Sequence, residues 1–271
     1  MTTSQLPGFR TLMLGEGGSG KTTAIRTLID CGITPFCIFT EQSFEVLGDI
    51  PSSKLHWKYI SPVADSLESM MDRITDISTL TTEMRLKKVD MGRNKDNKLM
   101  DFVKALNSFT CDRTGENFGP VKTWGTDRAL VVDSLSGWTT MAWGAVVGIK
   151  SGKAPVDYGV VQDELEAQIR WLCNVPRCHF VLTAHLEREV DEINGGSKLM
   201  AAAPGKKLAP ALPKHFSDVF MAEKRGKDFW WTTINPNASL KARNLPLEDK
   251  IPPTFKTIVE SWKSRGGVIE A

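Results

Sequence analysis

The sequence predicts an α/β fold in which a mostly parallel sheet carries helices on both faces and ends in an antiparallel edge. Through most of the chain, short apolar runs alternate with segments whose apolar residues recur at helical spacing, which is typical of parallel strands joined by helices. From residue 218 onward the apolar runs are separated by short charged turns, which favours antiparallel pairing. The chain has 271 residues, 41% of them apolar and 24% charged. We expect residues 1–271 to form a single domain.

The first half of the chain begins with a strand, a loop and a helix. Residues 11–14 form a short apolar run that ends at a glycine. After residue 21 the apolar side chains fall on one helical face until Gly32 ends the pattern. Residues 36–40 and 57–60 are further apolar runs bounded by turn residues, so two more strands are predicted there.

Residues from about 64 to 127 interrupt this alternation. Apolar residues recur at helical spacing on both sides of a polar stretch, residues 85–98, which carries six basic and two acidic side chains. We therefore expect a helical and basic insertion here.

The second half of the chain returns to the alternation of strands and helices. The predicted elements are a strand at 129–133, a helix at 161–172, a strand at 179–183, an antiparallel edge from 218 to 243 and a C-terminal helix at about 254–265. In such a fold the functional residues lie at the carboxyl ends of the parallel strands.

Composition and charge exclude several classes of protein. The net charge is +2, which is too small to indicate nucleic-acid binding unless basic residues gather locally. The chain begins without a secretory signal and holds no run of 18 apolar residues, so a cytoplasmic protein that does not enter a membrane is expected, in the host cytoplasm if a phage encodes it. The five cysteines include no CxxC pair. Cys173 and Cys178 beside His179 lack a fourth ligand, which argues against a zinc site.

A glycine-rich segment between the first strand and the first helix predicts a phosphate site. It consists of Gly15, Glu16, Gly17, Gly18, Ser19, Gly20, Lys21, Thr22 and Thr23. This is the P-loop pattern, in which backbone N–H groups surround phosphate oxygens, the lysine reaches the β- and γ-phosphates and the following hydroxyl binds Mg²⁺. The sequence therefore predicts ATP and Mg²⁺ as ligands.

Three polar side chains follow buried strands and are expected near this loop. Asp133 ends four apolar residues and is predicted to hold a Mg²⁺-bound water. Glu41 follows the second strand and is the predicted general base, with Glu45 as the fallback. His185 lies two residues beyond its strand and is predicted to sense the γ-phosphate. Each also has a plainer interpretation as a strand-end or turn residue.

The order of these motifs resembles the RecA/DnaB group of P-loop ATPases, and more closely the phage-encoded RecA-like ATPases that include single-strand annealing and recombination proteins. The resemblance spans about residues 8–245 and implies a three-layer RecA-like core. It also implies that Glu41 is the catalytic glutamate, that His185 is the polar sensor, and that Lys241 and Arg243 reach into a neighbouring subunit's ATP. That last role requires a homo-oligomer, either a ring or a filament with shared ATP sites. The alternative for Lys241 and Arg243 is a pair of solvated charges on a strand.

In the proteins it resembles, two loops face single-stranded DNA, and the corresponding segments here contain no acidic residue. Residues 134–156 carry Trp138, Trp143, Lys150 and Lys153, and residues 195–215 carry Lys198, Lys206, Lys207 and Lys214. Aromatic stacking with phosphate neutralisation suits single-strand binding. In the alternative interpretation the tryptophans pack in the core and the lysines are solvated.

Two functions remain open from the sequence. The first is a Mg²⁺-dependent ATPase, stimulated by single-stranded DNA, in phage recombination or replication. The second is a nucleotide-switched assembly or loader protein that acts on protein partners. A small-molecule kinase is less favoured, because no lid-like arginine cluster is evident.

Overall fold

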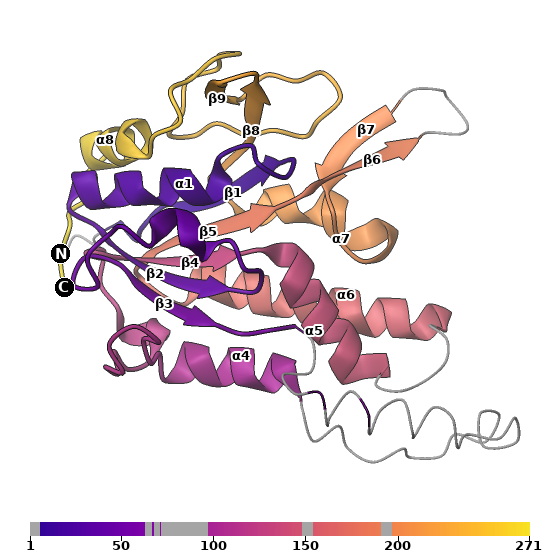
Figure 1. Cartoon of the computed structure of the whole chain (residues 1–271). Helices are drawn as coiled ribbons and strands as arrows, with labels where there is room; N and C mark the ends of the chain where they lie inside the picture. Colours follow the sequence, from indigo (N-terminus) through magenta and orange to yellow (C-terminus); the bar gives the residue numbers. More distant parts are fainter. Residues whose placement is uncertain (1–5, 63–66, 68–70, 72–96, 148–153, 191–196) are drawn as a thin grey trace, which may run out of the picture.

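In a computed structural model of the chain, the structure describes residues 6–62, 67, 71, 97–147, 154–190 and 197–271. These residues form a seven-stranded sheet and a separate two-stranded hairpin (Figure 1). The seven strands, in spatial order, are β3 (His56–Tyr59), β2 (Thr34–Phe39), β4 (Arg128–Asp133), β5 (His179–Ala184), β1 (Arg10–Gly15), β8 (Asp218–Arg225) and β9 (Asp228–Thr232). The first six pair in parallel, and β9 pairs antiparallel with β8. The predicted α/β class with an antiparallel C-terminal edge is confirmed.

Helices cover both faces of this sheet (Figure 1). One face carries α4 (Lys98–Asn107), α5 (Leu135–Val147), α6 (Pro155–Asn174) and α7 (Gly205–Ala211). The other carries α1 (Lys21–Ala24), its 3-10 continuation η1 (Ile25–Cys31) and α8 (Lys256–Ser264), which lies where the sequence predicts a C-terminal helix. Shorter 3-10 turns are η2 (Phe44–Leu47), η3 (Val121–Thr123) and η4 (Leu212–His215). The sheet is therefore the middle of three layers.

Side-chain alternation along the strands divides the core into two apolar clusters. Along β1, Leu12 and Leu14 pack towards α5 and α6, whereas Met13 packs towards α1 and α8. Along β4, Leu130 and Val132 alternate with Val131 in the same way. Successive side chains of a strand point to opposite faces, so runs that are apolar at every position are expected of strands covered on both sides.

The region predicted to be an insertion is only partly described. Residues 63–66, 68–70 and 72–96, which include most of the basic stretch, lie outside the described residues. Leu99, Phe102 and Leu106 of α4 are buried in the cluster that also holds α5 and α6. This part of the segment therefore contributes to the core.

A second sheet element is the antiparallel hairpin of β6 (Leu186–Val190) and β7 (Ser197–Ala201), which directly follows β5. The sequence analysis placed no strand here. None of the helices within the described residues is long and apolar enough to cross a bilayer.

Candidate active site

The P-loop joins the end of β1 to the start of α1, as its sequence predicts. Gly18 and Gly20 have φ values of 73° and 86°, a region that glycine enters at little cost because it has no Cβ. Gly15 is needed for space: a Cβ there would come within 2.5 Å of Ser19 Oγ and 2.7 Å of the Ala222 carbonyl oxygen. The loop therefore folds tightly against the neighbouring strand β8.

Lys21 and Ser19 direct polar groups into the loop. Lys21 Nζ donates to the carbonyl oxygens of Gly15 and Glu16, each at 2.8 Å. Burial lowers the pKa of this ammonium group, and the negative charges of Asp133, Glu41 and Glu16 partly offset that effect. Ser19 Oγ is buried and has no hydrogen-bond partner within the described residues. An unpartnered buried hydroxyl is costly, and it is consistent with a loop that accommodates a polar ligand.

Asp133 receives hydrogen bonds from three different segments. Its Oδ2 accepts from Thr22 Oγ1 at 2.7 Å and from Ser43 Oγ at 3.1 Å. Its Oδ1 accepts from Thr183 Oγ1 of β5 at 2.5 Å. Only 3% of Asp133 is exposed. The carboxylate thus connects the P-loop to the ends of the neighbouring strands.

Glu41 lies in a second group of polar side chains beside Asp133. Its Oε1 accepts from Ser134 Oγ at 2.5 Å, and its Oε2 lies 3.3 Å from His185 Nε2. About a third of the Glu41 and His185 side chains is exposed, so both can be reached from solvent. Glu45, the fallback candidate, is exposed on η2. The structure brings Glu41 and His185 together across the end of β4, which lies between β2 and β5 in the sheet.

The strand order explains why these residues converge. Parallel strands β2, β4, β5 and β1 are consecutive neighbours, and Phe39 pairs with Asp133 while Leu14 pairs with Ala184. The residues after each strand therefore meet at one edge of the sheet. Sequence analysis missed the hydroxyls of Ser134, Ser43 and Thr183, whose positions at strand ends are the only indication that the sequence offers.

Lys241 and Arg243 lie at the other end of the sheet. Lys241 pairs with Val219 near the start of β8, and its Nζ donates to the Phe216 carbonyl oxygen at 2.7 Å. The backbone N–H of Arg243 donates to Asp218 at 2.8 Å. Because Gly15 at the P-loop pairs with Ala222 further along β8, neither residue lies beside the P-loop of its own chain. Their predicted role concerns a neighbouring subunit and stays a prediction.

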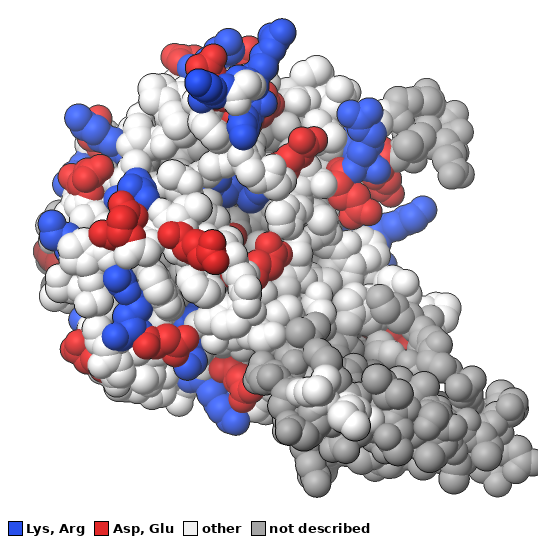
Figure 2. All heavy atoms as spheres, viewed as in Figure 1, with Lys and Arg blue, Asp and Glu red and all other residues white. Residues whose placement is uncertain are grey.

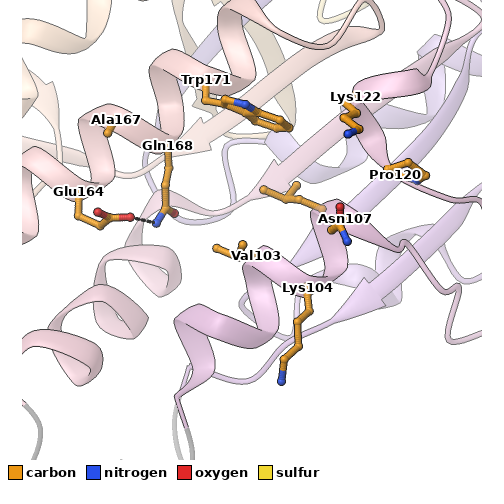
Figure 3. A pocket seen from close by; sticks show the side chains of 10 residues that line it. Val103, Lys104, Asn107, Pro120, Lys122, Glu164, Ala167, Gln168 and Trp171 are labelled. Atoms are coloured by element: carbon orange, nitrogen blue, oxygen red, sulfur yellow. Dashed lines mark hydrogen bonds between the residues drawn. The ribbon is translucent and has the colours of Figure 1, made fainter. Parts of the chain in front are cut away.

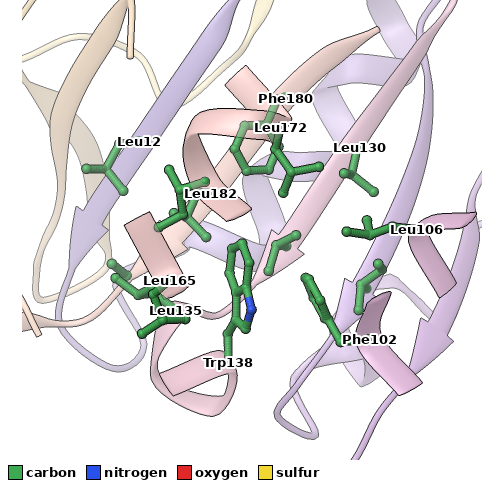
Figure 4. Packing of buried hydrophobic residues seen from close by; sticks show 14 of the residues in the cluster. Leu12, Phe102, Leu106, Leu130, Leu135, Trp138, Leu165, Leu172, Phe180 and Leu182 are labelled. Carbon is green, nitrogen blue, oxygen red and sulfur yellow. The ribbon is translucent and has the colours of Figure 1, made fainter. Parts of the chain in front are cut away.

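One of the predicted DNA-binding residues is placed where it cannot perform that role. Trp138 is completely buried, packs on Phe102 with ring centroids 4.5 Å apart, and donates from Nε1 to Gln168 Oε1 at 3.0 Å (Figure 4). The prediction that it stacks on DNA is wrong, because the segment after Asp133 is helix α5 and Trp138 is on its core-facing side. Trp143 is half-buried and packs edge-on against Tyr158.

The structure describes some of the lysines in the predicted DNA loops, and others lie outside the described residues. Lys150 and Lys153 lie outside the described residues. Lys198 is exposed on β7, and Lys206 and Lys207 are exposed in the first turn of α7. On the face drawn in Figure 2, basic and acidic side chains are interspersed. That face carries no broad basic surface.

A groove of about 570 Å³ lies between α4 and α6, on the face of the sheet opposite α1 (Figure 3). Val103 and Trp171 line it, and Gln168 Nε2 donates to Glu164 Oε1 at 2.6 Å beside them. The lining surface is mainly apolar, and its charged residues Lys104, Lys122 and Glu164 lie apart from one another (Figure 3), unlike the converging charged groups at the P-loop. We therefore place the candidate active site at the P-loop.

Similarity to a known protein family extends over most of the chain. A sequence profile described as AAA domain matches residues 8–244, a span that contains the P-loop, Glu41, Asp133 and His185. No curated protein matches the chain significantly. Among solved structures, the assembled ATPase EscN from the type III secretion system of enteropathogenic E. coli is similar at 13% identity, with a TM-score of 0.35. The match covers 79% of this chain and 43% of that one.

Proposed function

We propose a mechanism of ATP hydrolysis for this chain, which belongs to the AAA domain family of P-loop ATPases. In this proposal the P-loop binds the triphosphate and Glu41 activates the attacking water. The observation that carries it is the 2.7 Å hydrogen bond from Thr22 of the P-loop to Asp133 at the end of β4. This contact brings the two parts of the site that phosphoryl transfer requires to one place.

The P-loop supplies the phosphate contacts. Its backbone N–H groups are the donors, and the left-handed turns at Gly18 and Gly20 allow the loop to curve around an anion. Lys21 exchanges its bonds with two carbonyl oxygens for bonds with phosphate oxygens. A phosphate oxygen carries negative charge and a carbonyl oxygen does not, so the Coulomb attraction of the ammonium for phosphate favours this exchange. The unpartnered hydroxyl of Ser19 is a further donor.

The donor set also suits magnesium. Thr22 and Asp133 offer hydroxyl and carboxylate oxygens, the ligand type that Mg²⁺ prefers, and they would hold the ion. Within the described residues no three His, Cys, Asp or Glu side chains cluster as a metal site, and a P-loop magnesium site does not need such a cluster because substrate phosphates and water provide the remaining ligands. When bound, the ion offsets negative charge on the transferring phosphoryl group.

Glu41 is held in one orientation by its neighbours. Ser134 contacts one carboxylate oxygen and His185 the other, while a third of the side chain is exposed for water to approach. The carboxylate accepts a proton from the water as that water attacks the γ-phosphorus, and the bond from the γ-phosphorus to the bridging oxygen breaks, so that ADP leaves. His185 is a positioning residue in this scheme, because a contact between its ring and the γ-phosphate would also move Glu41.

ATP binding tests the proposal directly. Calorimetry with Mg²⁺ and ATP should show binding by the protein, and Lys21→Ala should weaken it by roughly a hundredfold or more, because an ammonium that contacts phosphate is removed. Lys256→Ala, which removes an exposed lysine on α8, is the matched control and should bind normally. A folded protein that takes up no ATP in the presence of Mg²⁺ would refute the proposal.

The finer proposal is that hydrolysis serves phage recombination or replication on single-stranded DNA. It is supported by the exposed Lys198, Lys206 and Lys207 and by the resemblance to phage RecA-like ATPases, and it no longer includes Trp138. Hydrolysis rates with and without single-stranded DNA, at low and high salt, test it. If DNA changes neither the rate nor its salt dependence, the alternative of an assembly protein acting on protein partners takes its place.

The proposed homo-oligomer rests on Arg243 more than on Lys241. Arg243 is exposed, whereas the Lys241 ammonium donates to the Phe216 carbonyl oxygen of its own chain. Of the two, Arg243 is therefore the better placed to reach a neighbouring subunit's nucleotide.

A further inference from the structure

We propose that Phe229 of β9 stacks on the base of the nucleotide, so that the β8–β9 hairpin is the base-binding arm of the site. The inference rests on the proposed function, because it assumes that the P-loop holds the phosphates of the same nucleotide. The inference concerns the base of the nucleotide, which the P-loop residues do not contact.

The Phe229 ring lies directly against the P-loop. A Cβ added to Gly20 would come within 3.0 Å of Phe229 Cδ1 and 3.5 Å of its Cε1. Gly20 is the last residue before α1 and has a positive φ. The ring therefore occupies the space beside the residue from which the phosphate-binding helix starts.

Phe229 is held at this position by its neighbours in the sheet. It alternates with Trp231, so both lie on the face of the sheet that carries α1 and α8. Trp231 is buried and packs on Phe220 with ring centroids 4.3 Å apart. At the other side of the hairpin, Ala222 of β8 pairs with Gly15 of the P-loop. The hairpin and the P-loop thus form one packed unit.

In contrast to Trp231, Phe229 keeps much of its ring open. Its exposed fraction is 41%, against 1% for Trp231. An aromatic side chain that is fixed beside a glycine-rich loop and remains partly exposed can accept a flat ligand at small entropic cost. Nucleobases stack on aromatic side chains with little dependence on base identity.

The cross-strand partner of Phe229 adds a polar contact beside the ring. Lys224 pairs with Phe229, and its Nζ lies 5.3 Å from the ring centroid. Lys224 belongs to a group of exposed basic residues at the hairpin tip, with Arg225 and Lys227, and blue and red side chains lie together at the top of the view in Figure 2, where Figure 1 places β8 and β9. A lysine there can donate to acceptor atoms of the base or the ribose without fixing which base is bound.

The test compares a ligand that has a base with one that lacks it. Calorimetry with Mg²⁺ gives the dissociation constants of ATP and of inorganic tripolyphosphate for the protein, Phe229→Ala, Phe229→Trp and the control Trp171→Ala, which removes an exposed aromatic side chain of α6. We expect Phe229→Ala to weaken ATP binding about fivefold to a hundredfold, the range for one base stacked on one aromatic side chain, and to leave tripolyphosphate binding unchanged. Phe229→Trp should retain ATP binding, and Trp171→Ala should change neither.

Other outcomes separate this inference from the proposed function. Unchanged ATP affinity in Phe229→Ala overturns the inference, and an equal loss for ATP and tripolyphosphate overturns it too, because Phe229 then supports only the phosphate loop. Thermal unfolding of each variant shows whether the hairpin still folds. If Phe229→Ala does not fold, Phe229→Leu, which keeps an apolar side chain without an aromatic ring, takes its place with the same expected results. If the unaltered protein binds neither ligand, the proposed function fails as well.

Discussion

The two edges of the sheet both carry charged side chains, but the partners of these charges differ. At the amino edge, Arg10 begins β1 and Asp218 begins β8. The Arg10 guanidinium donates to backbone carbonyl oxygens, those of Gly8, Phe9, Cys173, Pro176 and Cys178. Asp218 accepts from three consecutive backbone N–H groups, at 2.6–3.3 Å, and from the Asn244 side chain at 2.6 Å.

At the carboxyl edge, the carboxylates contact other side chains, while Lys21 donates to the carbonyl oxygens of Gly15 and Glu16. Asp133 accepts from three hydroxyl groups, and Glu41 contacts Ser134 and His185. Hydroxyls and imidazole can rotate and exchange partners, whereas backbone groups are fixed by the sheet. A third of Glu41 is exposed, while none of Asp218 is.

This difference separates structural charges from reactive ones. A charge whose partners are backbone groups fixes the chain around it, and it changes partners only where a ligand of opposite charge replaces them, as we propose for Lys21 and phosphate. A charge that is held by side chains and partly open can change its contacts during a reaction. We therefore expect changes at the amino edge to alter stability and changes at the carboxyl edge to alter turnover.

The largest effect is expected from Glu41→Gln. Loss of the general base should lower kcat by roughly 10²- to 10⁴-fold, while ATP affinity and the free energy of unfolding stay close to those of the unaltered protein, because glutamine is isosteric and retains an acceptor for Ser134. Steady-state hydrolysis, calorimetry and urea unfolding measure the three quantities. Glu45→Gln, at an exposed carboxylate four residues away, should leave kcat unchanged. If Glu45→Gln loses turnover and Glu41→Gln does not, the general base has been misassigned.

Asp218→Ala should lower the stability of the fold, whereas Glu41→Gln should lower turnover. The substitution leaves three backbone N–H groups and the Asn244 amide without their acceptor, and each buried group of this kind costs about 1–3 kcal/mol. We expect the free energy of unfolding to fall by about 3 kcal/mol or more, with the ATP affinity of the folded fraction retained. Urea unfolding of this variant and of Asp163→Ala, at an exposed aspartate of α6, measures the difference. A loss of turnover without a loss of stability would contradict the distinction between the edges.

The sequence predicts the reactive charged residues at the carboxyl edge better than it predicts their hydrogen-bond partners. Lys21, Asp133 and Glu41 were placed at one edge of the sheet because each follows a recognisable strand or belongs to a motif of fixed spacing. The sequence does not single out the hydroxyls of Ser43, Ser134 and Thr183. Single hydroxyls are common, and only the folded chain brings these three together. The sequence predicts Phe229 only as part of an edge strand. Its approach to Gly20 depends on how the hairpin packs, which the sequence does not show.

The error at Trp138 has a physical reason as well. Residues 134–156 contain no acidic side chain but carry two tryptophans and two lysines, which predicts a loop suited to DNA, whereas residues 135–147 within them contain no charged side chain at all. The same absence of charge is typical of a helix buried against a sheet, and Leu135, Trp138 and Ala142 do lie in the core. Absence of acidic residues does not distinguish these two cases unless lysines are interleaved within the segment itself.

The smallest effect is expected from lowering the pH, through protonation of His179, which lies at the amino edge beside Arg10. Burial, and secondly the charge of Arg10, lowers the pKa of this histidine from 6.5 to about 3, so the folded protein keeps the ring neutral. The unfolded chain binds a proton below about pH 6.5, and the folded protein does so only near pH 3. Stability is therefore lost as the pH falls through this window. Between pH 7 and pH 5 this group should remove about 2 kcal/mol from the free energy of unfolding.

Urea unfolding at both pH values, with His179→Gln as the comparison, isolates that contribution. His56 and His215, whose pKa values are also lowered mainly by burial, remain in both proteins and cancel in the difference. Glutamine can still accept the hydrogen bond that Phe9 N–H donates to His179 Nδ1 at 3.1 Å, so the variant should be weaker at pH 7 but lose less stability on acidification. Equal losses in the two proteins would mean that His179 becomes protonated in the folded state. The amino edge would then contain a group that changes its charge within the fold, and the contrast between a fixed amino edge and an adaptable carboxyl edge would no longer hold.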